Sequence, residues 1–279
     1  MGLVGCFVTP HPPIAVPDVG RERLGEVRAT VDAMFALGRE AARLEPDIVV
    51  LVSPHAPLDA RHLTVCLAAR YLGSLAMFGA PQVAVDLEAD EQLAQAVVAQ
   101  AEAAGLPVLG RGRPGSVVDL DHGAVVPLSF LLREMRRPPR FVELGFSFVP
   151  PAVHLAFGQA LARAVEACGH RVVFVASGDL SHRLTPDAPA GYTPLGAEFD
   201  ASVEAAFATA DEQALVGIPP GLIDAAGECG YRSLLVLFGS LRGRRYATRV
   251  LSHEGPFGVG YMVGAVDLAV EPRGGVPDG

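Results

Sequence analysis

The sequence predicts an α/β fold in which a mainly parallel or mixed central sheet carries helices on both faces of a single domain. Short apolar runs rich in β-branched residues alternate with longer segments of helical periodicity, which is the pattern of βαβ units. The run 173–176 is apolar throughout and is typical of a buried strand. The 279 residues are 50% hydrophobic and 19% charged, enough for one sizeable core.

The expected elements follow the chain in βαβ order. They are strand 3–10, helix 24–44, strands 47–54 and 63–69, helix 90–105, strand 141–147, helix 152–169, strand 171–177, helical stretches over about 195–216 and 220–241, and a last strand region 258–270. We expect residues 1–270 to form the single α/β domain. The Pro- and Gly-rich residues 271–279 predict a flexible C-terminal tail.

Composition excludes several classes of function. The net charge of −9 argues against a nucleic-acid partner. Every basic residue is Arg, so a P-loop lysine, a Schiff base and a pyridoxal-phosphate anchor are all excluded. The four cysteines are widely spaced, which argues against a disulfide framework or a zinc finger. No segment reaches the roughly 18 apolar residues of a membrane span, so we expect no membrane partner and a cytoplasmic protein.

Three histidines each follow an apolar strand directly. His11 ends "GCFVTPH", His55 ends "IVVLVSPH" and His182 ends "VFVASGDLSH". The carboxyl ends of parallel strands meet at one edge of a sheet, where ligands bind, so these side chains are expected to share one cleft. His11 and His55 also have matched Pro-flanked contexts, which stiffen a loop side chain as a metal ligand requires.

The other histidines follow less specific patterns. His122 lies in "DLDHGAVVPL", where an aspartate would cap the following helix and a glycine would let the backbone approach a ligand. His62, His154 and His170 are interpreted as structural or solvated. His253 precedes a Gly-rich run and is expected to pack rather than line a substrate pocket.

A two-histidine site for ferrous iron takes a carboxylate as its third ligand. Helical spacing over 220–241 aligns one row of side chains and makes Glu228 the best candidate. The row consists of Asp224, Glu228, Tyr231, Leu235 and Phe238. Cys229 is a rival, because its thiolate would bind a softer metal.

These motifs together resemble one enzyme family. In this order, "TPHPP", "SPHAP", "LDHGAVVPL", "GDLSH" and "GECGY" resemble the class III extradiol ring-cleavage dioxygenases, above all their catalytic (beta) subunit. The same superfamily contains the Memo proteins. The specificity of the resemblance lies in the order and spacing of the motifs, which extend across nearly the whole chain.

The resemblance implies a non-haem Fe(II) dioxygenase that cleaves a catechol-type or aminophenol-type ring with O₂. By this resemblance, His11, His55 and Glu228 would ligate the metal, and His182 and His122 would be the catalytic residues beside it. His182 would be the main acid and base, because histidine titrates near neutral pH. His122 would orient the substrate or stabilise oxygen.

Several alternatives stay open at the level of sequence. A Memo-like metal-binding or redox protein without ring cleavage would use Cys229 instead of Glu228 and favour copper. Two histidines and a carboxylate also suit zinc in a hydrolase. The expected partners are a small aromatic diol and O₂. The chain contains no small-subunit domain, so a homo-oligomer or a small partner subunit would help to close the cleft.

Overall fold

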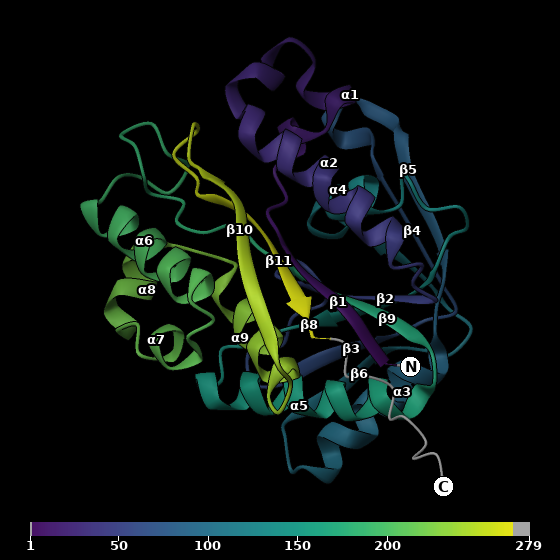
Figure 1. Ribbon diagram of the computed structural model, residues 1–279. Helices are drawn as coiled ribbons and strands as arrows, with labels where there is room; N and C mark the ends of the chain where they lie inside the picture. The colour runs from purple at the N-terminus through teal and green to yellow at the C-terminus, as the bar shows by residue number, and fades with distance from the viewer. Residues whose placement is uncertain (1, 270–279) are drawn as a thin grey trace, which may run out of the picture.

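The computed structural model describes residues 2–269 and is built around an eight-stranded sheet (Figure 1). The strand order is β10-β11-β1-β9-β2-β8-β3-β6. The bounds are β1 Gly2–Thr9, β2 Ile48–Ser53, β3 Leu63–Leu67, β6 Val108–Gly112, β8 Arg140–Gly145, β9 Arg171–Ser177, β10 Tyr246–Glu254 and β11 Tyr261–Leu268. Strands β1, β9, β2 and β8 are parallel, whereas β11 pairs antiparallel with β1 and β3 pairs antiparallel with β8. The prediction of a mainly parallel or mixed sheet is confirmed.

Helices cover both faces of this sheet, as predicted, with α3 and α5 on one side and α2 and α4 on the other in Figure 1. The helices are α1 Pro17–Gly20, α2 Arg28–Arg43, α3 Glu91–Ala103, α4 His122–Leu131, α5 Pro151–Cys168, α6 Pro194–Ala208, α7 Glu212–Val216, α8 Pro220–Ala226 and α9 Tyr231–Leu241. Short 3₁₀ segments lie at η1 Pro13–Ala15, η2 Arg21–Val27 and η3 Ala76–Phe78. Within residues 2–269, no helix combines the length and apolarity needed to cross a bilayer.

The two faces of the sheet bury separate cores, because successive strand residues point to opposite faces. On β1, Cys6 and Val8 pack in the core beneath α3, α5 and α9, whereas Phe7 packs in the core beneath α2 and α4. The central strand β2 is buried at every position. The continuous apolar runs of the sequence are therefore explained by strands covered on both sides.

A second sheet of three strands was not predicted. It has the order β5-β4-β7, with β4 Arg70–Leu75, β5 Ala80–Glu88 and β7 Val117–Leu120, and its buried side chains join the core of α2 and α4. These strands are half-exposed, and Gly and Pro interrupt the surrounding sequence, so their apolar signal is weak. The expected tail 271–279 lies outside the described residues.

The continuous helix expected over 220–241 is wrong. Gly227 adopts the left-handed conformation, with φ of 62°, and ends α8, and the chain begins again as α9 at Tyr231. Glycine takes this conformation without the steric cost that a side chain adds, so it commonly ends helices. The break removes the single row of side chains that helical spacing predicted for Glu228 and its neighbours.

Candidate metal centre

The histidines that follow β1 and β2 meet at one edge of the main sheet. The Nε2 atoms of His11 and His55 lie 3.2 Å apart, although 44 residues separate them in sequence. Both strands pair in parallel with β9, which lies between them, so the loops after their carboxyl ends emerge on either side of the end of β9. The expected convergence of these two histidines is therefore present.

His122 joins the pair from the first turn of α4. Its ring centroid is 4.5 Å from that of His55 and 5.5 Å from that of His11. The three side chains offer nitrogen atoms that all lie within 4.8 Å of one another. Asp121 caps α4 through a hydrogen bond from Gly123 N–H, as the sequence predicted. Gly123 is required here, because an added Cβ would lie 2.7 Å from the His55 ring.

The hydrogen bonds behind His11 fix the direction of its lone pair. The Ser177 hydroxyl donates to Gly123 O at 2.7 Å and therefore accepts from His11 Nδ1–H at 3.2 Å. The unprotonated Nε2 of His11 then faces His55. Burial, followed by the neighbouring imidazoles, lowers the pKa of His11 well below its ordinary value, so the ring is neutral at pH 7 and able to bind a metal.

Asp179 and His182 lie on the next strand end, after β9. The Asp179 carboxylate accepts from His11 N–H at 2.9 Å, and its other oxygen is 3.7 Å from His11 Nε2 and 4.0 Å from His182 Nε2. Burial raises the pKa of Asp179, and the surrounding histidines oppose that rise. His182 Nδ1–H donates to Gly227 O at 2.7 Å, so its Nε2 lone pair also faces inward.

The two rival third ligands of the sequence have separate environments. Cys229 Sγ lies 3.9 Å from His11 Nε2, and Cys229 forms a second candidate metal group with His11 and Asp179. Burial raises the pKa of the Cys229 thiol well above its ordinary value, so a thiolate there requires a cation beside it.

Glu228 is not brought to this cluster. Its carboxylate accepts from Tyr231 N–H at 2.6 Å and from Arg232 Nη1 at 3.0 Å, and the side chain is 2% exposed. It therefore caps α9 and belongs to neither candidate metal group among residues 2–269. Burial raises the pKa of Glu228, and its hydrogen bonds oppose that rise.

A cavity of about 420 Å³ opens onto His11, His122, Asp179 and His182. Its other walls are mostly apolar and come from the segment after β1, from η3 and from the start of β11; they are Pro12, Pro13, Ile14, Val19, Gly20, Arg23, Phe78, Val259 and Tyr261. Sequence reasoning missed these residues, because loops far apart in the chain supply them. The mixture of apolar walls and a few convergent polar groups is typical of small-molecule sites.

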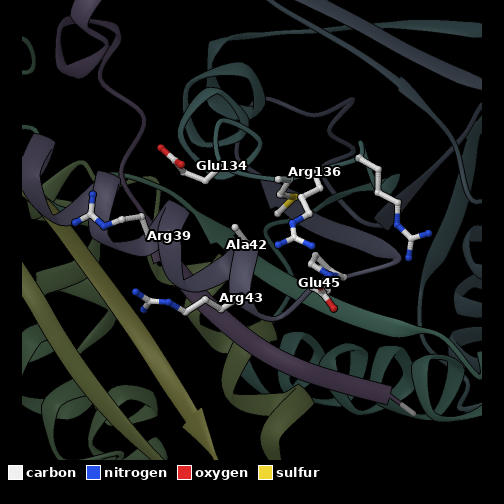
Figure 2. A pocket seen from close by; sticks show the side chains of 9 residues that line it. Arg39, Ala42, Arg43, Glu45, Glu134 and Arg136 are labelled. Atoms are coloured by element: carbon white, nitrogen blue, oxygen red, sulfur yellow. The ribbon is translucent and has the colours of Figure 1, made fainter.

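A larger hollow of about 620 Å³ lies elsewhere, against the end of α2 and the segment after α4. Figure 2 shows Arg39, Ala42 and Arg43 on α2, with Glu134 and Arg136 across from them. The lining of this larger hollow includes no histidine, cysteine or buried charge, so the cavity beside His11 is the candidate site.

The remaining histidines have their own protein partners. His62 Nδ1 is 2.9 Å from Asp59, and His170 lies 3.8 Å from Asp47. His154 is buried and contacts the carbonyl of Ser147. His253 lies between two carboxylates on α6, those of Asp200 and Glu204.

The chain matches known proteins along nearly its whole length. Residues 5–264 match the family model described as the catalytic LigB subunit of aromatic ring-opening dioxygenase. Protein CA_C1420 of Clostridium acetobutylicum is 33% identical over 268 residues, which cover 94% of this chain but only 57% of the relative. The crystal structure of the uncharacterized protein JW3007 from Escherichia coli K12 superposes with a TM-score of 0.64 at 19% identity, covering 95% of this chain and 99% of that one, and shows the same fold.

Proposed function

Because the chain belongs to the family of catalytic LigB subunits of aromatic ring-opening dioxygenases, we propose that it cleaves a catechol-type or aminophenol-type ring with O₂, using Fe(II). One observation carries the proposal: the nitrogen donors of His11, His55 and His122 converge within 4.8 Å. Two of these histidines line the same cavity as His182. The expected homo-oligomer or small partner subunit stays a prediction.

The donor set fits a metal ion. Two nitrogens bound at about 2.0–2.1 Å with an angle between 90° and 110° would be roughly 2.8–3.4 Å apart, and the Nε2 atoms of His11 and His55 are 3.2 Å apart. The lone pairs of His11 and His182 and a carboxylate oxygen of Asp179 also face one another. Such a concentration of acceptors favours a cation between them.

We assign His11, His55 and His122 as the ligands, in place of the set with Glu228 that the resemblance implied. Ferrous iron bound there would supply positions for an aromatic diol and O₂ and carry electron density between them. Asp179 and Cys229 form a second candidate group with His11, and their Oδ2 and Sγ atoms lie 3.7 Å and 3.9 Å from the same His11 Nε2.

His182 is the proposed acid and base. Its Nδ1 hydrogen is committed to the carbonyl of Gly227, so Nε2 is free to take a proton from a ring hydroxyl in the cavity. The Asp179 carboxylate, 4.0 Å from Nε2, stabilises the imidazolium that forms. Ile14, Phe78 and Val259 contribute apolar walls that orient an aromatic ring and exclude water.

The test is oxygen uptake by protein loaded anaerobically with Fe(II), measured against a panel of catechols and aminophenols. We expect uptake with formation of a yellow ring-opened product. The H182Q variant should lose about 10²–10⁴-fold in kcat while keeping its metal, the usual contribution of general acid–base catalysis. H62Q, whose ring lies outside the cavity, is the matched control. No uptake by the iron-loaded wild type with any compound of the panel would refute the proposal.

A second candidate, a Memo-like metal-binding or redox protein without ring cleavage, is favoured by the contact between Cys229 and His11. It predicts that copper binds and that C229S abolishes this binding, with no oxygen uptake. Equal copper content in C229S and the wild type would exclude it.

A further inference from the structure

Tyr261 is a buried tyrosine whose hydroxyl has no hydrogen-bond partner among residues 2–269. The residue is 5% exposed and lines the cavity that contains His182 and Asp179. Its hydroxyl makes no hydrogen bond with any group of residues 2–269. Two other buried tyrosines are different: Tyr71 donates to Cys66 O at 3.1 Å and Tyr231 donates to Leu215 O at 3.2 Å. The hydroxyl is not among the fully buried unpaired polar atoms of these residues, so it is accessible from the cavity that Tyr261 lines. A molecule bound in the cavity would therefore be its hydrogen-bond partner.

The backbone fixes Tyr261 relative to the loop that carries His182. The preceding residue, Gly260, donates to Ser181 O at 2.8 Å and accepts from Leu180 N–H at 2.8 Å. Only glycine fits at this position, because a Cβ would lie 1.9 Å from a carboxylate oxygen of Asp200. The start of β11 and the His182 loop are therefore held as one unit.

The ring of Tyr261 is also held by apolar packing. It belongs to a small cluster with Ala15, Val27, Val31 and Val259, which joins the segment after β1 to the start of β11. A ring packed in this way keeps one orientation, and its hydroxyl is presented to the cavity at little entropic cost. Burial, together with the nearby Asp179 carboxylate, raises the pKa of Tyr261, so the hydroxyl is a hydrogen-bond donor at neutral pH.

We propose that Tyr261 contacts the substrate, donating a hydrogen bond from its hydroxyl to an anionic oxygen of the bound aromatic compound. This inference rests on the proposed function. Tyr261 would recognise the ionised ring oxygen, and His182 would accept the proton that the ring hydroxyl loses. The predicted substrate class is therefore an aromatic compound that binds as an oxyanion.

The test uses 4-nitrocatechol, whose visible absorption reports ionisation and binding, in anaerobic titrations of the iron-loaded protein. The Y261F variant should bind it about 10-fold to 100-fold more weakly than the wild type, the range for one hydrogen bond to a charged acceptor. Metal content should be unchanged. Y246F is the matched control, since Tyr246 is partly buried on β10 and does not line the cavity.

A structural role is separated by thermal unfolding of the metal-free protein. Y261F removes a hydroxyl that has no partner in the described part of the chain, so its Tm should equal that of the wild type, whereas Y71F should lower the Tm. In turnover, Y261F should raise KM more than it lowers kcat. Binding of 4-nitrocatechol within twofold of the wild type would overturn the role of Tyr261 alone. If the iron-loaded wild type does not bind 4-nitrocatechol at all, the role of Tyr261 is overturned, and the absence of oxygen uptake decides separately against ring cleavage.

Discussion

Glu228 and His122 have opposite roles in the proposed site, and two measurements on their variants separate these roles. If Glu228 caps α9 and His122 binds the metal, E228Q should lose stability and keep the metal. H122Q should keep its stability without metal and lose the metal. The ligand set implied by the resemblance, with Glu228 as the third ligand, predicts that E228Q loses the metal instead.

The expected loss of stability in E228Q follows from the contacts of the carboxylate. Glutamine keeps one acceptor for Tyr231 N–H but removes the charge that pairs with Arg232, whose side chain is 20% exposed. Breaking a fully buried pair costs about 3–5 kcal/mol, and this guanidinium is partly solvated, so we expect about 2 kcal/mol. In a chain of this size that corresponds to a fall in Tm of about 4–8 °C.

The expected loss of metal in H122Q follows from the loss of one of three nitrogen donors. Changing a residue that only supports a ligand typically weakens metal binding 10–100-fold, so removing a ligand should weaken it by more than about 100-fold. Because bound metal stabilises the folded state by mass action, about 2.7 kcal/mol of metal-dependent stabilisation should disappear. The metal-free protein should change little, since among residues 2–269 the His122 ring makes no hydrogen bond and packs against the rings of His11, His55 and Phe78.

The assay combines metal content by mass spectrometry, after anaerobic loading and dialysis, with Tm measured in the presence and absence of metal. H62Q is the control for the loss of a histidine outside the site. If E228Q is empty of metal while H122Q retains it, the ligand assignment made from the structure is refuted and the set with Glu228 stands.

Two further predictions concern residues outside the ligand set. Burial lowers the pKa of His253, but hydrogen bonds to Asp200 and Glu204 outweigh it and raise the net value above 6.5. The stabilisation is then complete below about pH 6.5 and is lost as pH rises through the folded value, so H253Q should lower Tm more at pH 6 than at pH 9; an equal loss at both would contradict this. G178A should cost about 1–3 kcal/mol in urea unfolding and lower metal content, because its Cβ would lie 2.2 Å from facing backbone. G25A, with open space, is the control, and equal stability of the two variants would disprove the packing argument.

The sequence was sufficient to predict the fold class and the proximity of His11 and His55, because both depend on local signals. Continuous apolar runs identify strands buried on both faces, and a Pro-His pair directly after such a run locates a side chain at the carboxyl end of its strand. Since β1 and β2 both pair with β9, the proximity of His11 and His55 could be expected without knowledge of the loop paths.

The positions of Glu228 and His122 relative to the first two histidines could not be predicted in this way, because they depend on the path of loops. The row that included Glu228 assumed one helix, yet glycines at 227 and 230 flank the motif and are themselves a signal for a break. Tyr261 was missed for a related reason. Its relation to the site depends on close backbone approach at Gly260, which no periodicity reveals.

The break at Gly227 determines the surroundings of both Glu228 and His182. Because α8 ends there, Glu228 faces the first turn of α9, where its carboxylate accepts a hydrogen bond from Tyr231 N–H. The same turn directs the carbonyl of Gly227 at His182 Nδ1, at 2.7 Å, and so selects the tautomer with Nε2 free toward the cavity. One left-handed residue therefore keeps the Glu228 carboxylate away from the candidate site and orients His182, the proposed base, within it. A substitution that forces Gly227 out of this conformation should then impair His182 without touching a metal ligand, which makes this loop the part of the site most sensitive to backbone change.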